Sequence, residues 1–191
     1  MAKVIAFILC LGALVVTAAN AGEHSGRGAY SDALQWYFEA AEAGNAQAQF
    51  LLGLKYETGT DVERDLAQAA NWFEKSARQG NLEAQFKYAA LLEGGRGRVA
   101  DPVAAAQWYD RAARKGFAPA QYNLGVMQVN AASTDAERID GLAWLMKARD
   151  QGMVPATEFL ATIEELWPAE LVETAKRRVA EDTGSGGKRR P

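Results

Sequence analysis

The sequence predicts an all-α fold: a short α-solenoid of about four stacked helix-turn-helix repeats with a 36-residue period, followed by a C-terminal capping helix. Three columns of residues predict it, because each recurs at an interval of 36 over four copies. Internal repetition at a period of about 20 to 50 residues is typical of solenoids and repeat arrays. The columns are Trp36, Trp72, Trp108 and Trp144; Gly44, Gly80, Gly116 and Gly152; and Ala48, Ala84, Ala120 and Ala156.

The first helix of each repeat is predicted by the spacing of its small and aromatic residues. In the second copy they fall at i, i+3, i+4, i+7 and i+8, positions that share one face of an α-helix. This spacing favours packing of the tryptophans in the core over a ligand-binding role. The residues are Ala69, Trp72, Phe73, Ser76 and Ala77.

The expected ends of these first helices carry capping residues. Asp65 and Asp101 stand where an N-cap side chain accepts the free amides of the first turn. Pro102 fits the first helical position, where a missing N–H costs nothing. Gly80 and Gly116 are the expected C′ residues, where the chain must turn left-handed.

The second helix of each repeat begins near the alanine column. Residues 47–53, 83–89 and 119–125 align without gaps, and small residues recur in them at equivalent positions. Small residues let two helices approach closely, while larger residues fill the space beside them. A single helix pair cannot bury its apolar face alone, so we expect the pairs to stack into one continuous core.

These patterns place the repeats at about residues 31–64, 65–100, 101–136 and 137–166. Residues 167–182 are predicted to form the capping helix, with lysine and arginine near its C-terminus, where cations suit the helix dipole. The composition of residues 183–191 predicts a disordered basic tail.

The N-terminus has the features of a secretory signal peptide. Lys3 precedes an uncharged, mostly apolar run over residues 4–19, and Ala19-Asn20-Ala21 matches an A-x-A cleavage site. We therefore expect residues 1–21 to be removed, residues 22–30 to be flexible, and the protein to be exported to a bacterial periplasm or secreted. Retention as an uncleaved anchor is the alternative. After cleavage the chain would keep neither a membrane span nor a cysteine, since Cys10 lies in the apolar run.

Little in the sequence suggests catalysis. His24 is the one histidine and lies in the segment expected to be flexible, whereas a metal site needs several converging ligands. The glycines around Arg96 lack the downstream Lys and Ser/Thr of a phosphate-binding loop. Acidic residues outnumber basic residues before Lys176, which argues against a nucleic-acid partner. We therefore expect no enzyme activity, no cofactor and no metal.

The repeat resembles the Sel-1-like repeat (SLR) family, a tetratricopeptide-like (TPR-like) branch with the rough motif A-x-x-W-Y-x-K-A-A-x-x-G-x-x-x-A-x-x-x-L-G-x-x-Y. Residues 69–77 and 105–113 match its first helix, and residues 52–56 and 124–125 match its second. Residues 95–99 match the Gly-x-Gly-x-Val stretch between repeats, and the resemblance covers about residues 31–166. The fourth copy departs from the motif at Arg149, where alanine is expected, and residues 130–136 before it lack the inter-repeat glycines.

The resemblance implies a scaffold or adaptor that acts through protein–protein contacts, often in bacterial envelope assemblies and signalling. Some cysteine-rich secreted members are linked to β-lactams, but this chain lacks their cysteine pairs. A binding protein for envelope polysaccharide or peptidoglycan is the alternative, because an exposed aromatic residue such as Phe38 could stack on sugars.

Polar residues on the first helices form the candidate partner-binding surface. They lie at i, i+4 and i+7, off the apolar face, so stacking would align them into a basic ribbon flanked by amides. Such a ribbon suits an acidic or extended protein or peptide, through charge-assisted hydrogen bonds; an ordinary solvated face is the alternative. The predicted residues are Asn71, Lys75, Arg78, Gln107, Arg111, Arg114 and Lys147.

Overall fold

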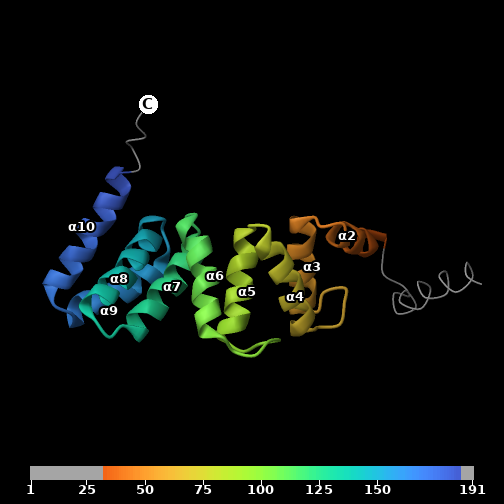
Figure 1. Ribbon diagram of the computed structural model, residues 1–191, viewed down its shortest axis with the longest axis horizontal. Coiled ribbons are helices and arrows are strands. Elements are labelled where there is room, and N and C mark those ends of the chain that lie inside the picture. The colour runs from red at the N-terminus through yellow and green to blue at the C-terminus, as the bar shows by residue number, and fades with distance from the viewer. Residues whose placement is uncertain (1–31, 186–191) are drawn as a thin grey trace, which may run out of the picture. The chain divides into compact units, whose positions relative to one another are not determined.

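The computed structural model describes residues 32–185, and all regular structure in that range is α-helical (Figure 1). The expectations for a signal peptide, a flexible N-terminal segment and the end of a basic tail fall on residues outside it. The helices are α2 (Asp32–Glu42), α3 (Ala46–Thr58), α4 (Leu66–Arg78), α5 (Leu82–Glu93), α6 (Pro102–Arg114), α7 (Ala118–Ala131), α8 (Asp135–Asp150), α9 (Val154–Leu166) and α10 (Ala169–Ser185).

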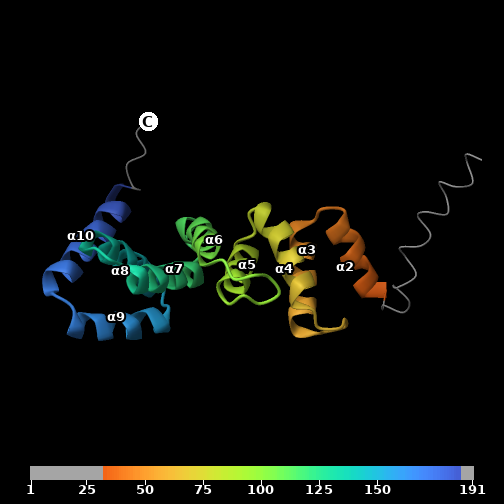
Figure 2. The same cartoon turned by 60° about the horizontal axis from the view of Figure 1, so that its bottom comes forward.

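The described residues from Tyr37 onward belong to one compact unit. Within this unit each helix from α3 to α8 packs against the next one along the chain. The helix pairs of successive repeats therefore stack in order, as predicted for an α-solenoid. The last helix breaks this order, because α10 packs mainly against α8 (Figure 2).

Side chains and glycines end the helices where the sequence predicts. The carboxylate of Asp65 accepts hydrogen bonds from the amides of Ala67 and Gln68, and Asp101 caps α6 in the same way. After α4 the chain turns through Gly80 at φ +93°, a conformation that only glycine adopts at low cost. Asp65 and Asp101 thus begin the first helices α4 and α6, and Gly80 lies in the turn between the two helices of one repeat.

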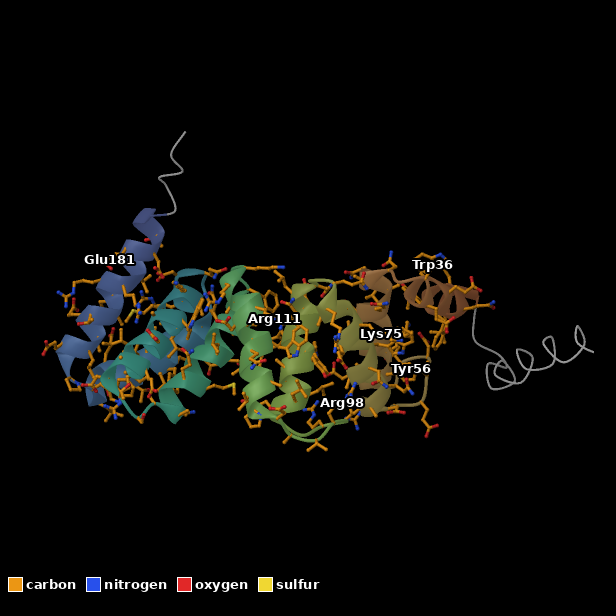
Figure 3. The ribbon with its side chains drawn as sticks, in the orientation of Figure 1. Trp36, Tyr56, Lys75, Arg98, Arg111 and Glu181 are labelled. Carbon is orange, nitrogen blue, oxygen red and sulfur yellow. The ribbon has the colours of Figure 1, made fainter. Side chains whose placement is uncertain are left out.

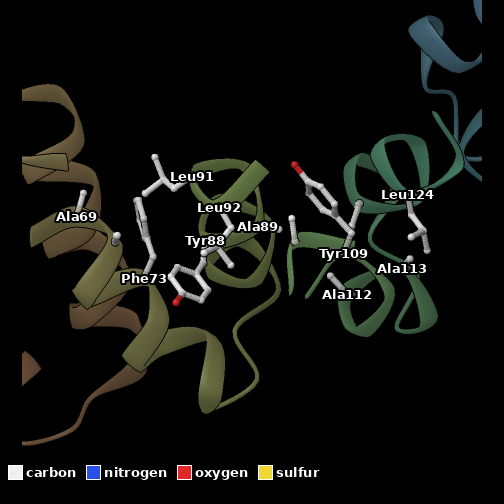
Figure 4. Packing of buried hydrophobic residues seen from close by; sticks show 13 residues of the cluster. Ala69, Phe73, Tyr88, Ala89, Leu91, Leu92, Tyr109, Ala112, Ala113 and Leu124 are labelled. Atoms are coloured by element: carbon white, nitrogen blue, oxygen red, sulfur yellow. The ribbon is translucent and has the colours of Figure 1, made fainter. Parts of the chain in front are cut away.

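The core of the repeats is built from small residues that surround a few large ones (Figure 4). Phe73 of α4 and Tyr109 of α6 are fully buried between neighbouring helices. The Tyr109 hydroxyl donates to the Glu93 carboxylate and accepts from the Asn123 amide, both at 2.9 Å. Burial raises the pKa of Tyr109, so the phenol stays protonated.

The tryptophan column does not pack uniformly. Trp72 is buried, as the helical spacing predicts, and Trp108 and Trp144 are half-buried. Trp36 is 60% exposed, so the expectation of core packing is wrong for the first copy. A tryptophan at this position is buried only as far as the neighbouring helices cover it.

Two boundaries differ from those expected. α8 begins at Asp135, within the range assigned to the third repeat, because Thr134 and Glu137 form a reciprocal capping box there. α10 continues past residue 182 to Ser185, and the Thr183 hydroxyl donates to the carbonyl of Val179 within the helix.

Candidate functional site

The predicted basic ribbon is built from cations that lie on the faces of the repeated tryptophans. Lys75 Nζ lies 3.9 Å from the centre of the Trp72 ring, and the Arg111 guanidinium lies 4.3 Å from that of Trp108. Lys147 repeats the contact on Trp144 at 4.6 Å. Each pair is spaced i, i+3 on one helix, and a cation–π contact holds the charged group in a fixed place. Figure 3 shows Lys75 on α4 and Arg111 on α6.

Arg78 and Arg114 are each neutralised within their own helix. Arg78 donates to Glu74 at 2.6 Å, and Arg114 donates to Asp110 at 2.7 Å. The hydrogen bond and the charge of Glu74 raise the pKa of Arg78. Exposed pairs of this kind are weak and exchange easily with another carboxylate. These two arginines of the ribbon are therefore already paired within the protein.

The amide of Asn71 is already occupied by the loop that follows α5. Arg98 of that loop donates to Asn71 Oδ1 at 2.7 Å and to Glu74 at 2.8 Å. The equivalent amide in the next repeat, Gln107, is exposed and borders a hollow between α6 and α7. The amide flank of the ribbon is therefore open on α6 and closed on α4.

Lys147 differs from its two equivalents because the last helix supplies a carboxylate. Asp182 of α10 accepts a hydrogen bond from Lys147 Nζ at 2.6 Å. Among residues 32–185, Lys75 and Arg111 are exposed and lie within ion-pairing distance of no carboxylate. The structure thus leaves two ribbon cations open, at the same register of neighbouring repeats.

Sequence reasoning missed Arg98 and Asp182, because both reach the ribbon from distant segments. It also missed a buried glutamine in the second helices of the first three repeats, Gln49, Gln85 and Gln121, whose Nε2 donates to a carbonyl eight residues earlier. The signal was available, since these glutamines also recur every 36 residues.

The observation that motivated the sugar-binding alternative fails in the structure. Phe38 is only 7% exposed, and its ring packs edge-on against Tyr56. A ring that is covered by its own core cannot stack on a sugar. Phe38 occupies the inner face of α2, which the spacing of the tryptophans does not reveal.

Within residues 32–185, no cluster of three or more His, Cys, Asp or Glu side chains is placed to hold a metal ion. In the same part of the chain, no helix has the length and apolar character needed to cross a bilayer.

Stacked helical hairpins with an exposed ribbon on their first helices define a repeat protein of the tetratricopeptide-like class. The Sel1 repeat model matches residues 24–45, 46–81, 82–117 and 118–153, and the chain belongs to the Sel1 repeat family. The matches have the same 36-residue period, but their boundaries fall between the two helices of each predicted repeat. Each full match therefore begins with the second helix of one predicted repeat and ends with the first helix of the next. Proteins built from Sel1 repeats generally mediate protein–protein interactions and are typically non-catalytic.

Two solved structures share the fold. One is a protective antigen of uropathogenic Escherichia coli strains, described as displaying an SLR fold, with a TM-score of 0.66 and 28% identity. That match covers 78% of this chain and 33% of the antigen, so this chain spans a third of the antigen's length. The other is a Sel1 repeat protein from Oxalobacter formigenes, with a TM-score of 0.62, 30% identity, and coverage of 69% of this chain and 99% of that one. No curated protein matches the sequence.

Proposed function

We propose that this protein is an exported scaffold of the bacterial cell envelope, and that it docks an acidic segment of a partner protein on α4 and α6. The observation that carries the proposal is the pair formed by Lys75 and Arg111, which are exposed, held on tryptophan faces and unmatched by carboxylates among the described residues. A cation that is already oriented loses little conformational entropy when it binds a carboxylate.

Charge reversal of these two cations tests the docking surface. The protein is used as bait on an envelope extract from its host, and the variant Lys75→Glu/Arg111→Glu is compared with the wild type. The control, Arg64→Glu/Arg177→Glu, changes the net charge equally at exposed arginines outside the ribbon. We expect the ribbon variant to lose the partner and the control to retain it. Equal recovery by both variants would reject the ribbon.

The ionic strength of the extract gives a second readout. Charge contacts at an exposed surface weaken as added salt shortens the Debye length from about 10 Å at 0.1 M to about 3 Å at 1 M. Partner recovery should therefore fall as salt is raised. Recovery that is unchanged at high salt would indicate an apolar contact elsewhere.

Export is supported by the charged start, apolar run and A-x-A site of residues 1–21. The test is N-terminal sequencing of the protein from fractionated cells. A start at Gly22 in the periplasmic or secreted fraction is the expected result, and a start at Met1 in the membrane fraction would support the anchor instead.

A further inference from the structure

One groove on the repeats is open to solvent. It lies between α6 and α7, encloses about 660 Å³ and is mainly apolar. Val103, Ala106, Gln107 and Arg111 line it from α6, and Met127 and Gln128 line it from α7. Val103 is 70% exposed, so an aliphatic side chain stands at the mouth of the groove.

The equivalent groove of the next repeat is filled by α10. The residues 36 positions after the α6 and α7 lining are Ile139, Leu142, Ala143, Lys147, Ile163 and Glu164. The apolar members of this set belong to the cluster that includes Val172, Ala175 and Val179 of α10. Lys147 pairs with Asp182, and Glu164 lies 3.8 Å from Lys176 Nζ. α10 therefore occupies, between α8 and α9, the position that is open between α6 and α7.

The equivalent position of the preceding repeat is covered by the chain's own loop over residues 94–101. A Cβ atom on Gly97 would lie 2.2 Å from the carbonyl oxygen of Leu66, which shows how closely the loop lies on α4. Arg98 holds the same loop to Asn71 and Glu74. The link from α7 to α8 is residues 132–134 only, so the third repeat has no such loop.

Two polar residues of the open groove lie at the positions equivalent to the residues that form ion pairs with α10. Arg111 stands where Lys147 receives Asp182, and it forms no ion pair with a carboxylate among the described residues; Asp110, which also lines the groove, is paired with Arg114. Gln128 stands where Glu164 receives Lys176, and its buried Oε1 accepts no hydrogen bond from any described residue.

We propose that the groove between α6 and α7 binds an amphipathic helix of the partner protein, in the manner in which α10 lies on α8. The helix presents small aliphatic residues in the register of Val172, Ala175 and Val179, a donor in place of Lys176, and a carboxylate in place of Asp182. The proposal rests on the docking function proposed above and names the class of partner for it.

The test uses the full chain and a fluorescent peptide with the sequence of residues 168–185 as the probe, measured by anisotropy and by the gain of helical circular dichroism on binding. Val103→Asp places a charge at the mouth of the groove and should weaken peptide binding about tenfold or more, the loss typical of a truncated interface anchor. Val99→Asp is the matched control, because Val99 is 89% exposed and lies outside the groove. It should bind the peptide like the wild type.

A charge exchange locates the peptide. Arg111→Glu should weaken binding of the native peptide, and an Asp182→Lys peptide should restore it on that variant alone. If the Asp182→Lys peptide does not regain affinity for Arg111→Glu, the peptide displaces α10 on α8. If an acidic peptide that gains no helix on binding has the same affinity, recognition is by charge only. Either result overturns the proposal. A partner that depends on Lys75 and Arg111 but not on Val103 would retain the docking function and reject the helical ligand.

Discussion

Gln79 Nε2 donates a hydrogen bond to Oε1 of Gln49 at 2.7 Å, and Gln151 makes the same 2.7 Å contact with Gln121 two repeats later. The pair joins the end of one first helix to the buried glutamine of the second helix before it. In the repeat between them the donor position holds Lys115. Oε1 of Gln85 is therefore buried with no hydrogen-bond partner among the described residues.

Lys115→Gln should restore the missing contact and stabilise the protein. One satisfied buried acceptor contributes about 1 kcal/mol, which corresponds to a rise of roughly 2–4 °C in Tm for a domain of this size. Lys115→Met, which removes the charge and keeps the chain length but supplies no donor, is the control. If both variants melt at the same temperature, the effect comes from the charge and not from the amide.

Gly80→Val should destabilise the protein, because Gly80 has φ +93° and a β-branched residue is poorly tolerated there. The expected loss is about 1–2 kcal/mol in the free energy of unfolding. Gly80→Asn is the control, since asparagine tolerates positive φ. A Cβ atom on Gly80 would lie 3.4 Å from Lys115 Nζ, an ordinary contact with the end of a flexible side chain, so steric clash is not the cause. Urea unfolding should rank wild type above Asn and Asn above Val; a Val variant equal to wild type would contradict the left-handed turn.

The sequence predicts the helical repeats well because their signals are local and recur at a fixed spacing. Asp65, Asp101 and Gly80 act through their immediate neighbours, so composition and position are enough to place them. The exposure of the Trp36 side chain depends on which helices cover it, and the periodicity of the sequence does not show this. The repeat length therefore predicts the fold, but it does not predict how exposed each of the repeated tryptophans is.

The candidate site was predicted only in part for the same reason. The register of Lys75 and Arg111 follows from helical spacing, and the structure places both on tryptophan faces as equivalents. The occupation of Asn71 by Arg98 and of Lys147 by Asp182 depends on a loop and on a helix that folds back. Contacts between segments more than twenty residues apart do not show in a local pattern.

The carboxylate of Glu74 should titrate below its ordinary range. Partial burial opposes ionisation, but the hydrogen bond and charge of Arg78 and the charge of Arg98 outweigh it and lower the pKa of Glu74 from 4.5. Because the folded-state pKa is depressed, the carboxylate contributes stability above its unfolded pKa and loses it as pH falls through the folded value.

Arg98→Ala should therefore raise the pKa of Glu74 towards 4.5, which a carboxyl-carbon NMR titration measures directly. The acid-induced loss of stability should also become less steep, because less of it depends on ionised Glu74. Arg64→Ala is the matched control, since the Arg64 side chain bonds the carbonyl of Glu57 and not Glu74. An unchanged titration in Arg98→Ala would remove Arg98 from the set of groups that hold Glu74 ionised.

Gly125→Ala should destabilise the contact between α7 and α8. A Cβ atom on Gly125 would lie 2.7 Å from Leu145 Cγ and 2.9 Å from the carbonyl oxygen of Gly141, so the two helices would have to separate. Alanine is the better helix former by about 1 kcal/mol, but overpacking of a tight core costs about 1–3 kcal/mol. We expect the steric effect to prevail, with a lower Tm. Gly94→Ala is the control, because its nearest neighbours lie at 3.4 Å and its φ is −84°. A Gly125→Ala protein that melts at or above the Gly94→Ala temperature would show that α7 and α8 are not in close backbone contact.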